Sequence, residues 1–407
     1  MREEYREKRI FENVDTGGGE YSLEAVVRSA AQRMIQGALE AEVTEFLGRL
    51  PGEKSEAAEG FRGYRNGHHK ERKISTAVGA LTLRQPRVSD VPTEAGEYRS
   101  QLLRPYKRRS EGLDSLFPRL FIEGLATRDF EPALRALIGE EAPLSPSSIS
   151  RLNKQFKDEY NEWKSRRLDD LEIIYMWADG IYLKAGIADE KLCALVVMGA
   201  DRTGKKHLLA IVEGYRESKE SWLELLRDLK NRGMNEPAIA VADGALSFWA
   251  ALPEVWHQTK KQLCWLHKIR NILDKLPKAE HKEATERIRA VYLSEEKVNA
   301  ERLAKNLMND WKQTGYLKAV ECLERALERL LTFHAFPSEH ARHLRTTNPI
   351  ESPFAAVKLR TNAARRFRTP RSALHLLFKL LQRSEKGWQR LSFPEKLKEV
   401  KLPDNLL

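Results

Sequence analysis

Apolar residues recur at helical spacing in residues 22–47, near the start of the chain. Ser22 is a favourable N-cap for this helix, and Gly48 is the kind of residue that ends one. The helix stands alone before a Gly- and Glu-rich stretch, so its apolar face needs a partner. That partner is either another subunit or the same chain. Residues 1–60 are therefore expected to form an N-terminal helix and a linker.

The apolar period shortens to two within residues 61–110. Lys73–Val78 and Leu81–Val88 lie on either side of Gly79-Ala80, a pattern that predicts a two-stranded β-hairpin. The stretch before the hairpin, residues 61–72, interleaves aromatic, basic and glycine residues. It suits contact with a phosphate backbone, and it also suits a solvated loop.

Helical spacing returns in residues 111–165. Two helices, a turn near Gly139–Leu144 and a third helix from Ser145-Pro146 predict a helix-turn-helix domain, although a plain three-helix bundle has the same pattern. In a helix-turn-helix, the side chains placed to face a major groove would be Ser147, Ser148, Arg151 and Lys154.

From residue 170 the pattern is that of an α/β fold. An apolar run ends in Asp179-Gly180, two further strands complete a meander, and a helix capped at Ser218 leads to a buried strand that runs into Asp243-Gly244. This is the order of an RNase H-like sheet. Residues 266–345 are helical in pattern, and the α/β pattern resumes at NPIES. We therefore expect one core formed by residues 170–265 and 346–407, interrupted by an all-α insertion.

Composition is that of a globular protein, and 407 residues are too many for one hydrophobic core. The net charge of +11 is concentrated: residues 60–110 carry 12 Lys/Arg against 4 Asp/Glu, and residues 354–401 carry 13 against 3. Such clustering favours phosphate neutralisation over a merely basic surface. The arginines and lysines expected to contact DNA in these two stretches are Arg62, Arg65, Lys70, Arg72, Arg360, Arg365, Arg366, Arg368 and Arg371. The C-terminal cluster could also be partly a solvated helix face.

The chain contains no run of about 18 apolar residues and no apolar signal core near its start, so we expect neither a membrane span nor export. Its three cysteines, Cys193, Cys264 and Cys322, are odd in number and scattered, which argues against a disulfide framework. The expected location is the cytoplasm, in association with the nucleoid.

Three acidic residues stand where a metal-dependent nuclease needs them. Asp179 and Asp243 each follow an apolar strand, and those strands are neighbours in the expected topology. Glu351 lies at a helix start, with Asn348 as N-cap and Pro349 at the first helical position. Phosphodiester transfer uses two divalent ions about 4 Å apart, and Mg²⁺ prefers carboxylate ligands. We therefore expect two Mg²⁺, with Mn²⁺ as a substitute, held by Asp179, Asp243 and Glu351.

The chain resembles the bacterial Mutator-type insertion-sequence transposases, which are DDE enzymes, from about residue 60 to residue 390. The segments that carry the resemblance are YRNGHHKER, RPYKRR, GLATRDF, WADGIYLK, ESWLELLRDLKNRG, VADGALSFWAAL, CWLHKIRN and NPIES. The resemblance implies that Asp179, Asp243 and Glu351 are the catalytic triad and that Cys264 and His267 are the family's Cys-x-x-His element. It departs after Asp243, where many relatives have a short Gly-containing turn and this chain reads Gly-Ala-Leu-Ser-Phe-Trp.

The resemblance also implies the partners: double-stranded DNA, as terminal inverted repeats and as target, and a second copy of the chain in a homodimer on paired ends. It implies a circular intermediate as well. The fold expected from all of this is an α/β RNase H-like core with an all-α insertion, preceded by mainly α DNA-binding domains with a β-hairpin.

Several residues admit more than one interpretation. Cys264 and His267 could form a zinc site together with His340 and His343, or the two could be a purely structural pair. Alternatively, His267 could lie beside the scissile phosphate and act as a catalytic group. Trp265 and Trp311 could stack on an unpaired base, or they could be core residues.

Two rival functions fit parts of the sequence. A site-specific nuclease of the same fold would cut DNA without joining it. A helix-turn-helix regulator derived from a transposase would bind DNA only, and it would have no need for three acids in this arrangement.

Overall fold

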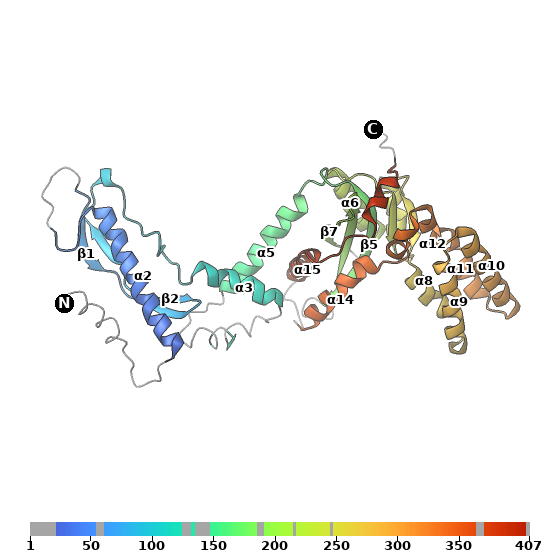
Figure 1. The fold of residues 1–407 in the computed structure, drawn as a ribbon, viewed down its shortest axis with the longest axis horizontal. Helices are drawn as coiled ribbons and strands as arrows, with labels where there is room; N and C mark the ends of the chain where they lie inside the picture. The colour runs from blue at the N-terminus through green and yellow to red at the C-terminus, as the bar shows by residue number, and fades with distance from the viewer. Residues whose placement is uncertain are drawn as a thin grey trace. The chain divides into compact units, whose positions relative to one another are not determined.

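The computed structural model describes residues 22–53, 61–123, 132–133, 135, 147–184, 191–214, 217–244, 247–363 and 370–403. The chain divides into two compact units, Met1–Leu152 and Asn153–Leu407. The first contains a long helix packed on paired strands, and the second contains a five-stranded sheet with helices packed against it (Figure 1).

Helix α2 (Leu23–Leu47) has the predicted ends: the Ser22 side chain accepts from the backbone of Ala25 at 3.2 Å, and Gly48 adopts φ 68°. Its buried Leu39 joins a core with side chains of the hairpin. The same-chain partner for this helix is therefore confirmed along its C-terminal half.

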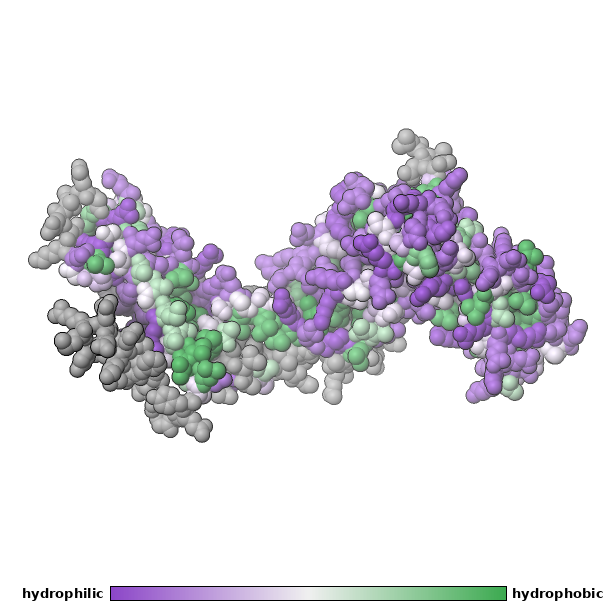
Figure 2. Space-filling view, viewed as in Figure 1, coloured by the Kyte–Doolittle hydropathy of each residue, from purple (hydrophilic) through white to green (hydrophobic). Residues whose placement is uncertain are grey.

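The N-terminal half of α2 is different. Leu23 and Met34 are each 75% exposed, and Val26 and Val27 are also exposed. Apolar side chains show as green on the surface near this end of the helix (Figure 2).

Strands β2 (Arg72–Thr76) and β3 (Gly79–Leu83) form the predicted hairpin. The turn lies two residues earlier than expected, because Thr76 pairs with Gly79 and Ala77-Val78 form the loop. Gly79 has φ 114°, a conformation that a side chain disfavours, so glycine suits the first residue after the turn.

A second strand pair corrects the expected loop before the hairpin. Strand β1 (Tyr64–His68) pairs antiparallel with β4 (Pro86–Ser89). The strand expected to run to Val88 is thus interrupted after Leu83, and the chain resumes as β4 at Pro86. Most side chains of β1 are exposed, so the strand has no apolar period by which it could have been recognised.

Short helix η1 (Thr93–Ala95), helix α3 (Glu111–Glu123) and helix α5 (Ser147–Ser165) follow. The turn near Gly139–Leu144 and most of the segment before it lie outside the described residues. The side chains of Ser147, Ser148 and Arg151 also lie outside them, whereas Lys154 is described and exposed. The boundary between the two units falls inside α5, so the segment expected to be one helix-turn-helix domain contributes to both units.

The sheet of the second unit has the order β7-β6-β5-β8-β9. Its strands are β5 (Ile173–Lys184), β6 (Lys191–Asp201), β7 (Lys206–Glu213), β8 (Ile239–Ala242) and β9 (Lys260–Leu263). The first three form the predicted antiparallel meander, and β8 and β9 run parallel to β5. Helix α6 (Lys219–Asn231) begins at the predicted cap, Ser218.

Strand β5 departs from the expectation that Asp179 ends a strand. It continues through Asp179-Gly180 and pairs with β6 as far as Lys184. Only the parallel pairing stops, after Ala178 opposite Ala242. Asp179 and Asp243 therefore directly follow Ala178 and Ala242, the last residues that pair β5 with β8, and this is the neighbouring position that the sequence predicted.

The edge strand β7 has its outward polar groups bonded to side chains, which blocks pairing with a further strand. Tyr160 of α5 donates to the Ile211 carbonyl at 2.8 Å, Arg232 donates to the Leu209 carbonyl at 2.8 Å, and the Leu208 N–H donates to Glu385 at 2.8 Å. These bonds also fix α5 and the C-terminal helix α15 (Pro370–Glu385) to the sheet.

Residues 266–345, all of them described, contain helices and no strand, as predicted. The helices from β8 to the C-terminus are α7 (Phe248–Val255), α8 (Trp265–Leu273), η2 (Lys278–Glu280), α9 (His281–Leu293), α10 (Lys297–Gln313), α11 (Leu317–Glu324), α12 (Leu327–Leu330), η3 (Thr332–Ala335), η4 (Ser338–His340), α13 (Ala341–Leu344), α14 (Asn348–Ala363), α15 (Pro370–Glu385) and η5 (Pro394–Glu399). Within the described ranges, none of the helices is long and apolar enough to cross a membrane.

The two tryptophans considered for base stacking are core residues. Trp265 is fully buried and its indole N–H donates to the Leu330 carbonyl at 2.8 Å, and Trp311 is 4% exposed. A base cannot reach either ring face, so the stacking interpretation is wrong and the core interpretation is confirmed.

Candidate active site

The four residues predicted to carry the chemistry come from four elements and meet at one place. Asp179 lies within β5, Asp243 follows β8, His267 lies on α8 and Glu351 lies in the first turn of α14. His267 stands between two of the acids: its Nε2 is 4.0 Å from Asp243 Oδ2, and its Nδ1 is 3.7 Å from Glu351 Oε1. Asp179 is near enough for the charges of Glu351 and His267 to change its pKa.

Glu351 is held by Thr347, the residue that directly precedes its helix. The Glu351 N–H donates to the Thr347 carbonyl at 2.9 Å, and the Thr347 hydroxyl donates to the Glu351 carboxylate. Helix α14 begins at Asn348, so Thr347 rather than Asn348 precedes it and Pro349 takes its second position. This corrects the predicted cap by one residue and leaves Glu351 in the first turn.

Cys264 lies at the junction between β9 and α8, fully buried. Its backbone N–H donates to Ala242 at 3.0 Å, which ties the end of β9 to the end of β8. Its sulfur accepts from the Thr347 N–H at 3.4 Å and lies 3.1 Å from the Thr347 hydroxyl. Cys264 therefore links the strand that carries Asp243 to the helix that carries Glu351.

The imidazole of His267 has a raised pKa, about 9. Its interaction with the Cys264 sulfur is the largest cause, and the negative charges of Asp243 and Glu351 add to it, against the effect of burial. This interaction lacks good hydrogen-bond alignment, because Nδ1 is buried and has no hydrogen-bond partner among the described residues. His267 is therefore held as a cation between two acids.

The interpretation of Cys264, His267, His340 and His343 as one zinc site is wrong, because His340 and His343 are bonded elsewhere. His340 accepts from the Tyr175 hydroxyl at 2.8 Å and donates to the Phe393 carbonyl at 3.0 Å, and His343 lies beside Ser392. A different set replaces it: Cys264, His267 and Glu351 offer ligand atoms within 4.8 Å of one another. Among the described residues, the three triad acids are not gathered as closely as this.

Asp179 has a pKa raised to about 7. Burial is the main cause, and the charges of Glu351 and Glu217 add to it, while the Gly180 N–H and His267 act in the opposite direction. Several carboxylates thus share a poorly solvated space with one histidine. Such an arrangement favours the binding of positive charge.

Glu217 is a fourth acid at the site that the sequence analysis missed. It has φ 55° and lies directly before the Ser218 cap of α6. Its carboxylate lies against Gly180, where a Cβ would overlap it, and it accepts a hydrogen bond from Tyr182. A glycine inside a strand often marks a close approach, so Gly180 was the signal that could have pointed to this neighbour.

Two arginines expected to contact DNA are bonded within the first unit. Arg65 pairs with Glu40 at 2.8 Å and donates to the Thr44 hydroxyl at 2.5 Å. Arg72 donates to the Lys107 carbonyl at 2.5 Å. Both hold the strands to neighbouring elements, so any contact with a phosphate would compete with these bonds.

The other residues expected to contact DNA lie on several different elements of the two units. Arg62 and Lys70 are exposed on the first unit, and Arg360 is partly exposed on α14. Arg365, Arg366 and Arg368 lie outside the described residues, and Arg371 is exposed on α15.

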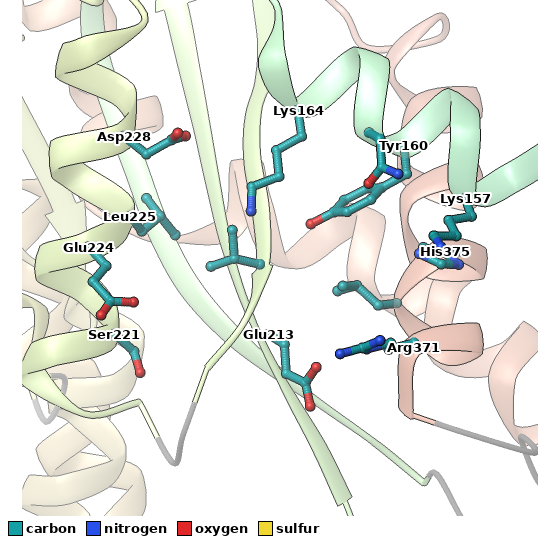
Figure 3. A pocket seen from close by; sticks show the side chains of 13 residues that line it. Lys157, Tyr160, Lys164, Glu213, Ser221, Glu224, Leu225, Asp228, Arg371 and His375 are labelled. Carbon is teal, nitrogen blue, oxygen red and sulfur yellow. The ribbon is translucent and has the colours of Figure 1, made fainter.

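Arg371 lines a cavity of about 410 Å³ between α5, α6, β7 and α15 (Figure 3). Lys157 and Lys164 lie on the α5 side, whereas Glu224 and Asp228 lie on the α6 side. None of the triad acids lines it. Its mixed charge makes it a poor surface for a phosphate backbone.

Comparison with known proteins shows the family to which the chain belongs. The model of the family described as "Transposase, Mutator family" matches residues 8–391, so the chain belongs to the Mutator family of transposases. The transposase of insertion sequence element IS6120 from Mycolicibacterium smegmatis is 43% identical over 69% of this chain and 87% of that protein. The transposase of element IST2 from Acidithiobacillus ferrooxidans is 40% identical over 66% and 92%. The transposase of IS256 in transposon Tn4001 from Staphylococcus aureus is 26% identical over 91% and 93%.

Proposed function

We propose that this transposase is a DDE enzyme that binds the terminal inverted repeats of an insertion sequence and cuts and joins DNA at Asp179, Asp243 and Glu351. One observation carries the proposal. In a chain of this family, Asp243 and Glu351 lie on either side of His267, and Asp179 of β5 is near enough for the charges of Glu351 and His267 to change its pKa, although the three acids are far apart in sequence.

The sheet supports an RNase H-like catalytic core. Three antiparallel strands are followed by two parallel ones, and Asp179 and Asp243 come directly after the last residues that pair β5 with β8. On this proposal the helical residues 266–345 are an insertion between β9 and α14.

The residues present fit a pair of Mg²⁺ ions. The three acids offer carboxylate oxygens, which Mg²⁺ and Mn²⁺ prefer as ligands, and phosphodiester transfer uses two such ions about 4 Å apart. Bound there, the ions would activate the attacking oxygen and stabilise the leaving oxygen. Asp179, Asp243 and Glu351 would be the ligands, and Glu217 lies within electrostatic range of Asp243.

The protein's own residues would orient the phosphate and transfer one proton. In the first step a water oxygen bonds to phosphorus and the bond to the 3′-oxygen breaks, which frees a 3′-OH. In the second step that 3′-oxygen attacks another phosphodiester, whose own 3′-oxygen leaves. The protonated His267 is placed to donate a hydrogen bond or a proton to the leaving oxygen.

We further propose that a homodimer holds two DNA ends, and that it acts on DNA in the bacterial cytoplasm. The exposed apolar residues on the N-terminal half of α2 support self-association. Light scattering at increasing concentration, with and without Leu23→Ser and Met34→Ser, tests this: the substitutions should favour the monomer.

A cut-and-join assay tests the function. The inverted repeats flanking the gene supply the DNA end, which is labelled and incubated with a target plasmid in Mg²⁺ or Mn²⁺. A transposase gives both a cut end and a joined product. A cut end without joining would identify the nuclease, and binding without any cut would identify the regulator.

A further inference from the structure

A second groove, of about 670 Å³, lies beside α14 and differs in charge from the cavity at α5. It is formed by the start of β7, α13, the first two turns of α14 and the chain that follows α15. Its cations are Lys206, Arg342 and Arg390, and Asn348 and Ser352 add polar groups. Among the described residues that line it there is no aspartate or glutamate.

The cations of this groove form no ion pair with any acid that the structure describes. Within the described ranges, none of Lys206, Arg342 and Arg390 forms an ion pair. Lys206 and Arg342 are close enough to repel each other, and this repulsion adds to burial in lowering the pKa of Lys206. Burial and the same two cations lower the pKa of His343 to about 4, so this histidine is neutral. Positive charge kept together without a partner is stabilised by a bound anion.

The groove adjoins the candidate active site through one helical turn. Asn348 and Ser352 line the groove, while Glu351 lies between them on α14. A helical turn is about 5.4 Å long, and the rise per nucleotide of one DNA strand is about 3.4 Å. A strand whose scissile phosphate lies at Glu351 would therefore bring its next few phosphates to the groove. The positive N-terminal end of α14 points the same way.

We propose that this groove binds the phosphate backbone of the DNA strand that flanks the scissile phosphate. The proposal rests on the proposed function and adds the path of the DNA to it. Lys206, Arg342 and Arg390 bind phosphates without reading sequence, and Asn348 and Ser352 donate to the same backbone. Such contacts fix the position of the strand at the acids.

The test measures how DNA affinity depends on salt. Full-length wild-type protein and the double variant Lys206→Gln/Arg342→Gln bind a labelled random-sequence duplex of about three helical turns, in EDTA, over a salt series. Two lost phosphate contacts should lower the slope of log K against log salt by about 1.8 and weaken binding about 10- to 100-fold at about 0.1 M salt. Cleavage by the variant should need more DNA for half-saturation.

Two controls isolate the cause. The charge-preserving variant Lys206→Arg/Arg342→Lys should keep the wild-type slope. Arg289→Gln, an exposed arginine on α9, should also leave the slope unchanged. A double variant with the wild-type slope and half-saturation would overturn the proposal, and so would an equal loss with Arg289→Gln. Unchanged DNA binding with loss of binding to an acidic peptide would assign the groove to a protein partner instead.

The two proposals can fail separately. If wild-type protein cuts no DNA, the proposed function fails, and the salt slopes still decide the groove. If wild-type protein cuts DNA and the double variant matches it in both slope and half-saturation, the groove proposal fails alone.

Discussion

The surroundings of Asp179 oppose the charge of its carboxylate. Burial and the neighbouring acids raise its pKa to about 7, whereas a free aspartate has a pKa near 3.8. Because the folded-state pKa is above the unfolded one, protonated Asp179 stabilises the fold at low pH. That contribution is lost as the pH rises from about 4 to about 7.

Asp179→Asn removes this dependence, because the amide stays neutral. Without divalent ions, we expect the substitution to stabilise the protein more at pH 8 than at pH 5, with a difference of about 2–3 kcal/mol. Urea denaturation at both pH values measures it. An equal effect of the substitution at the two pH values would show that Asp179 is not desolvated among acids.

Substitution of His267 distinguishes a catalytic role of this residue from a structural one. If its protonated imidazole assists the leaving oxygen, His267→Ala should lower the single-turnover cleavage rate by about 10²-fold or more, with little change in melting temperature or DNA affinity. The measurement is made on one preparation whose zinc content is also determined. A zinc-free, stable variant that cuts at the wild-type rate would refute the catalytic role.

The same preparation decides the other two interpretations of His267. If Cys264, His267 and Glu351 held zinc, wild-type protein would carry stoichiometric zinc, and a chelator would lower its melting temperature. If the histidine were structural, its loss would lower the melting temperature and leave the rate of the folded fraction unchanged.

At the residue scale, sequence patterns predicted the acids better than their surroundings. Asp179 and Asp243 could be picked out because each follows an apolar strand, and Glu351 because it lies at a predicted helix start. The family's Cys-x-x-His motif added His267. Glu217 could not be found in the same way. It precedes an ordinary helix cap, and only the fold brings it to Gly180.

At the scale of elements, the start of α14 joins the parts of the site. Thr347 bonds to Glu351 through its hydroxyl and to the Cys264 sulfur through its N–H. Thr347→Val keeps the size of the side chain and removes the hydroxyl. We expect a loss of about 1 kcal/mol in stability and slower cleavage, because Glu351 loses the group that orients it. Thr347→Ser, which keeps the hydroxyl, should retain most of the rate; equal rates for both variants would contradict this role.

The packing of α2 on the hairpin gives a prediction for the first unit. Leu39 is fully buried against the strands, whereas Met34, on the same helix, is 75% exposed. Leu39→Ala should destabilise the first unit by about 2–5 kcal/mol, and Met34→Ala should change its stability by less than about 0.5 kcal/mol. Urea denaturation followed by far-UV circular dichroism measures both. Similar losses would mean that the helix does not pack as described.

Elements with a strong apolar period were predictable, and short or polar ones were not. The strands of the meander have long apolar runs and α6 has apolar residues at helical spacing, so these elements were predicted. Strand β9 has only four residues, two of them lysines, and was not predicted. Strand β5 was expected to end at Asp179 because Asp-Gly usually marks a turn. Its pairing with β6 carries it straight through, and this pairing is a tertiary contact that no local pattern reveals.

At the scale of the whole molecule, acidic and basic side chains gather at two different places in the second unit. The acids gather at the strand ends of the second unit, and an acid-free basic groove lies one helical turn away. The sequence predicted a basic C-terminal stretch, but Lys206 and Arg342 lie outside that stretch and reach the groove only through the fold. Charge counted along the chain therefore located one source of positive charge and missed another.

Metal-dependent cleavage by the three triad variants tests the central claim most directly. Asp179→Asn, Asp243→Asn and Glu351→Gln are each incubated with the labelled DNA end under single-turnover conditions, in Mg²⁺ and in Mn²⁺, and their DNA affinity is measured beside the rate. Each variant should bind DNA nearly as wild type and yield neither cut nor joined product, because a metal ligand is lost while the DNA surface is kept. Near-normal cleavage by any one of them would show that the residue is not part of the catalytic site.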